Sequence, residues 1–274
     1  MIKRPIPKTG EELPIVGLGT WQTFDVGGDA AERAPRAEVL RLLFEAGGSV
    51  VDSSPMYGRA EGVVGDLLAE AGAHDKAFVA TKIWTRGRDE GIAQIEESLR
   101  RFRAGRIDLM QIHNLLDWRT HLATLRVMKS DGLIRHIGVT HYTSGAHDDL
   151  VAVIEGEEID FVQVNYSIGE RGAERRLLPA AAARGVAVLV NLPFESGGLF
   201  RSVRGERLPD WAAEFDCASW GQFFLKFVLA HPAVTCAIPG TADPAHMADN
   251  LTAGRGRLPD AAMRRRMIRF WEDV

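Results

Sequence analysis

The feature that most constrains this chain is a regular alternation of short apolar runs with segments of helical periodicity. From Val50 to Val186 the runs begin every 26 to 29 residues, which fits one strand, one helix and two short loops. Residues 92–102 and 177–184 carry apolar side chains at helical spacing, and Gly185 follows the second segment as a helix C-cap would. The runs begin near Ile15, Val50, Phe78, Ile107, Ile134, Asp160, Val186 and Val234.

Continuously apolar runs are typical of parallel strands that helices cover on both faces. Eight such units in 274 residues predict an α/β fold of the (β/α)₈ TIM-barrel type, whose usual size is about 250 residues. A doubly wound open sheet is the alternative. It would have fewer units and a G-x-G-x-x-G turn after an early strand, whereas here Gly17-Leu18-Gly19 is followed by Thr20-Trp21-Gln22.

The barrel is expected to form one domain over residues 1–274, because no linker or low-complexity segment interrupts the pattern. Residues 5–13 contain a turn-like Lys8-Thr9-Gly10 between apolar ends, which predicts a short β-hairpin before the first barrel strand. The interval between the last two runs is 48 residues and contains Gly197-Gly198, so we expect an insertion there.

Composition limits the partners that this chain can have. It is 46% hydrophobic with a formal charge of −4, and that charge argues against nucleic acid. Cys217 and Cys236 form no disulfide framework, and no metal-ligand spacing is present. No apolar stretch approaches the ~20 residues of a membrane span, and no signal-peptide core follows the N-terminus. We expect a cytoplasmic protein without a membrane or metal.

Reactive side chains in such a barrel come from the C-terminal ends of the strands. Asp52 and Tyr57 follow the second predicted strand, Lys82 ends the third and His113 ends the fourth. Asp52, Tyr57 or His113 taken singly could be a turn cap or a packing residue. A lysine that ends an apolar strand, however, needs a partner to keep its charge. Three consecutive strand ends thus bring together a carboxylate, a phenol, an ammonium and an imidazole.

These residues resemble the aldo-keto reductase family. The resemblance extends, in the family's order, through Gly17-Leu18-Gly19-Thr20-Trp21, Ile137-Gly138-Val139, Gln163-Val164-Asn165-Tyr166 and Ile238-Pro239 with Asn250. It implies a (β/α)₈ fold and carbonyl reduction by NADP(H), with NAD(H) possible. It also implies a monomer, and no exposed apolar helix face stands out against that expectation. It also implies that Asp52, Tyr57, Lys82 and His113 are catalytic. Tyr57 is expected to give the proton, Lys82 and Asp52 to adjust its pKa, and His113 to orient the substrate oxygen.

The resemblance also implies a cofactor site, in which this sequence departs from many relatives. A Ser-Asn pair becomes Thr140-His141, and Asn191 replaces a tyrosine that stacks on the nicotinamide. The cations that hold a 2′-phosphate are replaced by Gly240 and His246, which puts the preference for NADP in doubt. The expected cofactor residues are Gly19, Thr20, Trp21, Thr140, His141, Gln163, Asn191, Leu192, Phe194, Gly240, Thr241, His246, Asp249 and Asn250.

Aromatic residues follow several strand ends, and we expect Trp21, Phe24, Trp84 and Trp118 to line a pocket for an apolar or aromatic carbonyl compound. Two other functions stay open. The chain could be a redox-sensing barrel that binds nicotinamide with little turnover, or a lyase in which Lys82 forms a Schiff base. The lyase requires an uncharged Lys82, whereas Asp52 favours the charged form.

Overall fold

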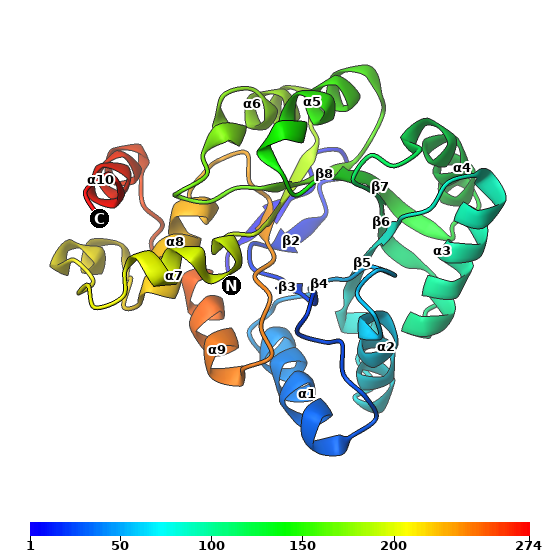
Figure 1. The fold of residues 1–274 in the computed structure, drawn as a ribbon, viewed down its shortest axis with the longest axis horizontal. Coiled ribbons are helices and arrows are strands. Elements are labelled where there is room, and N and C mark those ends of the chain that lie inside the picture. Colours follow the sequence, from blue (N-terminus) through cyan, green and yellow to red (C-terminus); the bar gives the residue numbers. More distant parts are fainter.

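A computed structural model describes residues 1–274 and has an eight-stranded parallel barrel at its centre, surrounded by helices (Figure 1). The strand order is sequential from β3 to β10, so the predicted barrel is confirmed. The barrel strands are β3 (Leu18–Gly19), β4 (Val50–Asp52), β5 (Phe78–Ile83), β6 (Ile107–His113), β7 (Ile134–Thr140), β8 (Phe161–Asn165), β9 (Ala187–Asn191) and β10 (Cys236–Ala237).

The barrel closes between its first and last strands, which are both short. Val16 bridges Ala237 and Gly19 bridges Gly240, each in parallel. Glycine is needed at the start of the barrel because neighbouring backbones approach closely on both sides. A Cβ atom on Gly19 would lie 2.8 Å from the Ile238 carbonyl oxygen at the seam, and one on Gly17 would lie 2.9 Å from the Val50 carbonyl oxygen of β4.

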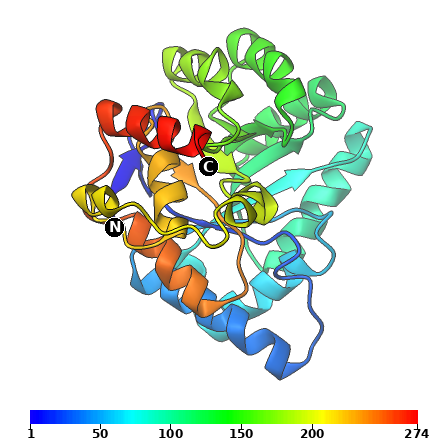
Figure 2. The same cartoon turned by 60° about the vertical axis from the view of Figure 1, so that its left-hand side comes forward.

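Helices follow the strands and cover the outside of the barrel (Figure 2). The pairs α1 and α9, α2 and α3, α5 and α6, and α8 and α9 pack against each other. No helix is both long and apolar enough to cross a membrane. The helices are α1 (Ala30–Glu45), α2 (Ala60–Glu70), α3 (Arg88–Phe102), α4 (Trp118–Ser130), α5 (His147–Gly156), α6 (Leu177–Arg184), α7 (Gly198–Ser202), α8 (Trp220–Leu229), α9 (Pro244–Ala253) and α10 (Ala261–Glu272).

The predicted N-terminal hairpin is also confirmed. Strands β1 (Lys3–Pro5) and β2 (Glu12–Pro14) pair antiparallel. Ile6 and Leu13 join the interior residues of the barrel in one buried apolar cluster, while Glu11 pairs with Arg135 beside the start of β7. The hairpin therefore closes the end of the barrel at which the strands begin, and it leaves the opposite end open.

The long interval before β10 holds the predicted insertion. Between β9 and α8 the chain forms two short 3₁₀ helices, Glu195–Gly197 and Asp210–Phe215, on either side of α7. Phe194 and Phe200 pack against each other there, with ring centroids 5.0 Å apart. Since this segment starts at the C-terminal end of β9, it forms one wall of the open end.

Candidate active site

The C-terminal ends of the strands surround a cavity of about 1100 Å³. Most of the residues that the sequence led us to expect at the site line this cavity. They are Gly19, Thr20, Trp21, Asp52, Tyr57, Trp84, His113, Thr140, Gln163, Asn191, Leu192, Phe194, Gly240, Thr241, His246, Asp249 and Asn250. Lys82 lies just behind this lining, almost completely buried.

Lys82 is held by two short contacts at the floor of the cavity. Its Nζ donates to Asp52 Oδ2 at 2.6 Å and to the Ser53 carbonyl oxygen at 2.7 Å. The same Nζ lies 5.1 Å from the centre of the Tyr57 ring. Burial favours the neutral amine, but Asp52 and Tyr57 oppose it and hold the pKa of Lys82 above its ordinary value. The ammonium is therefore charged at neutral pH.

A row of side-chain amides fixes the other oxygen of Asp52. Gln111 Nε2 and Gln163 Nε2 donate to Oδ1 at 2.9 and 2.8 Å. Since a carboxylate only accepts, both NH₂ groups must face it, and Gln163 Oε1 is left to accept from Thr140 Oγ1 and Asn191 Nδ2. The charge of Asp52 thus determines the orientation of amide groups as far as β9.

Burial and the charge of Lys82 shift the pKa of Tyr57 in opposite directions. Desolvation raises the pKa of the phenol, Lys82 lowers it and Asp52 raises it, and the net shift is upward. The sequence led us to expect that Lys82 and Asp52 adjust this pKa. Lys82 does lower it, but burial outweighs that effect, so the phenol is protonated near neutral pH.

His113 is a neutral imidazole in the same cavity. Burial, and then the charge of Lys82, lower its pKa to about 3. Its ring lies edge-on to Tyr57, with centroids 6.2 Å apart. Ser54 Oγ is 3.3 Å from its Nδ1. Ser54 was not among the expected site residues, although its place between Asp52 and Tyr57 could have suggested it.

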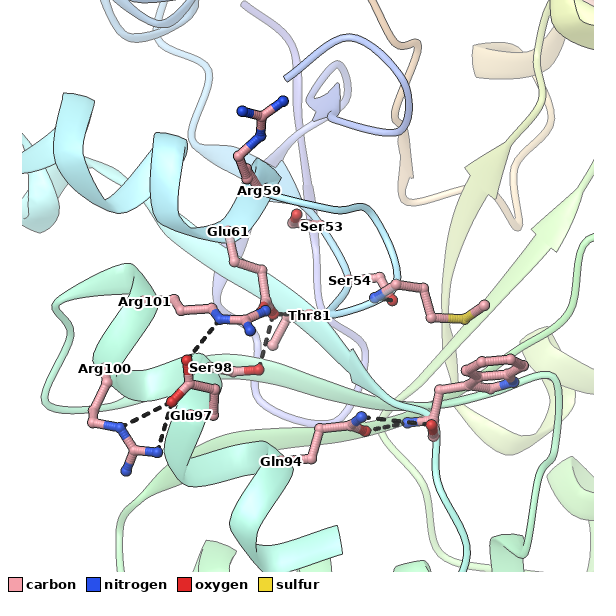
Figure 3. Close-up of polar contacts among 12 residues, drawn as sticks. Ser53, Ser54, Arg59, Glu61, Thr81, Gln94, Glu97, Ser98, Arg100 and Arg101 are labelled. Carbon is pink, nitrogen blue, oxygen red and sulfur yellow. Dashed lines mark hydrogen bonds and ion pairs between the residues drawn. The ribbon is translucent and has the colours of Figure 1, made fainter. Parts of the chain in front are cut away.

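Glu61 connects the helix that follows the loop of Ser54 to β5 and α3 (Figure 3). Glu61 lies in the first turn of α2, is completely buried, and accepts hydrogen bonds from Thr81 Oγ1 at 2.6 Å and Ser98 Oγ at 2.9 Å. Burial raises the pKa of this carboxyl. Thr81 precedes Lys82 on β5, so this contact ties the start of α2 to the strand that carries the lysine.

Two buried amide oxygens in the cavity have no partner within the protein. They are Asn114 Oδ1, next to His113, and Asn191 Oδ1, at the end of β9. Unpaired buried acceptors are costly, so both are suited to a ligand that carries N–H or O–H groups. Asn114 was not expected from the sequence; it lines the cavity, and its backbone has a positive φ of 53°.

At the far end of the cavity, the groups near His246 are engaged with the protein itself. Thr241 Oγ1 accepts from the Asp243 amide at 3.0 Å, and the Asp243 carboxylate caps α9 and lies 3.8 Å from His246 Nδ1. Asp249 accepts from Ser219 and Gln222 at the start of α8. No lysine or arginine lines the cavity.

Besides Lys82, three residues that the sequence led us to expect at the site do not line the cavity. Phe24 is completely buried in the core and Trp118 packs against the core beneath Arg119, so neither lines the cavity. His141 is also absent from the cavity lining, and its Nδ1 accepts from the Tyr142 and Thr143 amides. Sequence position after a strand end does not determine the direction of a side chain. Met56, Tyr142 and Phe200 occupy the rim instead.

Comparison with known proteins agrees with this geometry. The sequence model of the aldo/keto reductase family matches residues 15–266. The chain belongs to this family. It is 31% identical to methylglyoxal reductase YeaE of Escherichia coli over 92% of this chain and 89% of that protein. As a member, the chain is an NAD(P)H-dependent oxidoreductase, and the resemblance noted in the sequence is confirmed.

Two further proteins are similar to this chain. An NADH-specific methylglyoxal reductase of Escherichia coli is 27% identical over 77% of this chain and 73% of that protein. An aldo/keto reductase of Klebsiella pneumoniae, solved in complex with NADP and acetate, has a TM-score of 0.83 at 24% identity, over 99% of this chain and 96% of that one. The second likeness establishes the shared fold.

Proposed function

We propose that this enzyme reduces aldehydes and ketones to alcohols, with Tyr57 as the proton donor. The observation that carries the proposal is a protonated phenol in an open cavity, beside a buried ammonium and a neutral imidazole. Hydride addition to a carbonyl carbon leaves an alkoxide, and a proton donor within reach of that oxygen completes the reaction. Tyr57 is that donor, while Lys82 stabilises the tyrosinate that remains.

The remaining residues hold the reacting groups in place. The reduced nicotinamide, when bound, supplies the hydride. Thr140, Gln163 and Asn191 are suited to its carboxamide, because Asn191 Oδ1 is an unpaired acceptor and Thr140 has a hydroxyl. Asp52 keeps Lys82 charged and directed at Tyr57. His113 donates a hydrogen bond to the substrate oxygen and orients it.

The substrate in this proposal is apolar or aromatic. The chain has eight exposed large hydrophobic residues, and most of them gather around this one cavity. Exposed apolar groups in a cluster indicate a binding surface, whereas scattered ones are ordinary. The rim residues are Trp21, Met56, Trp84, Tyr142 and Phe200. Methylglyoxal, the substrate in the names of several relatives, is small, so it would leave most of this rim uncovered.

The test is turnover of NADPH and NADH with a panel of carbonyl compounds, from methylglyoxal to aryl aldehydes. We expect wild-type activity that is highest with the aryl aldehydes. Tyr57→Phe should lower carbonyl reduction by at least ~10²-fold, the usual scale for general acid catalysis. Cofactor binding, followed by fluorescence, should change little and serves as the control.

The same panel decides between this function and its alternatives. A protein that binds nicotinamide tightly but turns over none of the panel would be a redox sensor. A Lys82 adduct trapped by borohydride would support a Schiff-base lyase. That outcome conflicts with the two hydrogen bonds and the raised pKa of Lys82, because a Schiff base forms from the free amine.

A further inference from the structure

The hydroxyl of Ser54 contacts His113 from behind the cavity. Ser54 lies on the loop between β4 and α2 and is completely buried (Figure 3). Its Oγ is 3.3 Å from His113 Nδ1 and also accepts from the Met56 amide at 3.3 Å. No other side chain of the protein bonds to this Nδ1, and no hydrogen bond within the protein engages Nε2.

The direction of the Ser54–His113 hydrogen bond follows from the partners available. The Met56 N–H can only donate, so Ser54 Oγ accepts there and its own proton must go elsewhere. Nδ1 is the one acceptor that the structure offers to this proton. If Nδ1 carried the proton instead, the buried hydroxyl proton would have no partner, at a cost comparable to a lost hydrogen bond.

We propose that Ser54 sets the tautomer of His113, so that Nδ1 accepts from the serine and Nε2 presents an N–H to the cavity. Ser54 is then a positioning residue, since it acts on the substrate through His113. The catalytic consequence rests on the proposed carbonyl reduction, whereas the tautomer itself does not.

The choice of tautomer matters because the His113 imidazole is neutral. Burial and Lys82 lower the pKa of His113 to about 3, so the ring carries a single proton at neutral pH. One ring nitrogen therefore has an N–H and the other has a lone pair. A lone pair directed at a carbonyl oxygen would repel it, and the repulsion would grow as that oxygen becomes an alkoxide. Only the Nε2–H form stabilises the developing charge.

The first experiment measures the tautomer in the unliganded protein and requires no turnover. Two-bond ¹H–¹⁵N correlations of ¹⁵N-histidine-labelled protein distinguish a protonated from an unprotonated ring nitrogen, and His113→Gln assigns the signals. We expect wild-type His113 to carry its proton on Nε2 at pH 7. A wild-type protein with the proton on Nδ1 would overturn the proposal, whatever reaction the enzyme performs.

The second experiment compares variants. Ser54→Ala should show a measurable Nδ1–H population for His113, and Ser54→Thr, which keeps the hydroxyl, should restore the wild-type spectrum. Ser53→Ala is the matched control: it removes an equally buried hydroxyl from the neighbouring residue, which contacts Thr20 rather than His113. The His113 signals of this control should be unchanged.

Kinetics then connect the tautomer to catalysis. With an aryl aldehyde, Ser54→Ala should lower kcat by three- to tenfold with a smaller change in KM, because the N–H contact strengthens as charge develops. Ser54→Thr should recover most of the loss. A Ser54→Ala protein that keeps the wild-type tautomer and the wild-type kcat would show that the serine only fills space.

Discussion

Lys82 keeps a charged ammonium inside the protein because its neighbours accept its hydrogen bonds and Asp52 carries the opposite charge. Asp52 Oδ2 and the Ser53 carbonyl oxygen accept its hydrogen bonds, and Gln111 and Gln163 satisfy the remaining oxygen of Asp52. A buried ion pair is tolerated only when its other lone pairs and protons are also bonded. At the residue scale, the site is therefore one continuous network from Lys82 to Asn191.

We also expect single residues to determine the selectivity between NADPH and NADH. A 2′-phosphate needs cationic donors, and the arrangement around His246 supplies none, while Asp243 brings a carboxylate within 3.8 Å. Arg257, four residues beyond the end of α9, pairs with Asp216. We expect NADPH to be accepted, with a smaller margin over NADH than a cationic site would give.

Two substitutions test this selectivity. His246→Arg should favour NADPH over NADH by about 1 kcal/mol or more, roughly fivefold in the ratio of Kd values, if one charge-assisted hydrogen bond forms. Asp243 would compete for that arginine, so adding Asp243→Ser, which keeps a helix-capping hydroxyl, should enlarge the gain. Dissociation constants for both cofactors measure the change. A strong wild-type preference for NADPH that neither change affects would mean that other residues hold the phosphate.

At the scale of elements, α2 and α3 approach so closely that one position tolerates only glycine. A Cβ atom on Gly65 of α2 would lie 2.0 Å from the Arg101 carbonyl oxygen and 2.7 Å from the Phe102 Cα. These are backbone atoms, which cannot rotate away. Since α2 follows the loop that carries Tyr57, this contact contributes to the position of the Tyr57 phenol.

Gly65→Ala should therefore destabilise the protein by about 1–3 kcal/mol, the usual cost of overpacking. Gly62 on the same helix is the matched control, because a Cβ there meets nothing within 4 Å. Gly62→Ala should stabilise the protein by up to about 1 kcal/mol through helix propensity. Urea unfolding of both variants measures the difference, and equal effects would contradict the close approach.

At the scale of the whole molecule, closure of the barrel brings the C-terminal ends of six strands to one cavity. Asp52, Lys82, His113, Thr140, Gln163 and Asn191 each end or nearly end a separate strand from β4 to β9. Only closure of the barrel brings the ends of β4 and β9 to one cavity. The hairpin fills the other end with Ile6 and Leu13.

Folding also buries histidines without a charge, which predicts how stability depends on pH. Burial lowers the pKa of His113, His136 and His231 below the unfolded value of about 6.5. Below that pH the unfolded chain binds protons that the native protein refuses, so the free energy of unfolding falls as the pH falls. Each such group lowers the free energy of unfolding by up to about 1.4 kcal/mol for each pH unit below 6.5. For His113 this decrease continues to about pH 3.

We therefore expect unfolding in urea to require less free energy at pH 5 than at pH 8. His113→Gln should reduce that difference by up to about 2 kcal/mol, because one titrating group is removed. If the variant has the same pH dependence as the wild type, His113 gains a proton as readily in the native state as in the unfolded state.

The sequence by itself determined the barrel, the hairpin and the residues around Asp52, Tyr57, Lys82 and His113. Apolar periodicity reports which segments become buried strands, and parallel strands must end at the same side of a barrel. Side-chain direction was decided only by the tertiary structure. Phe24 and Trp118 follow strand ends yet pack into or against the core, while Tyr142 and Phe200 reach the rim.

Tertiary structure also decided the balance of forces on Tyr57 and the contact of Ser54. The attraction of Lys82 for tyrosinate follows from charge and can be predicted from composition at strand ends. The opposing effect of burial depends on how many atoms surround the phenol, which is known only once the chain is folded. The hydrogen bond between Ser54 and His113 likewise joins the loop after β4 to the end of β6, and only the folded barrel brings the two side chains within 3.3 Å.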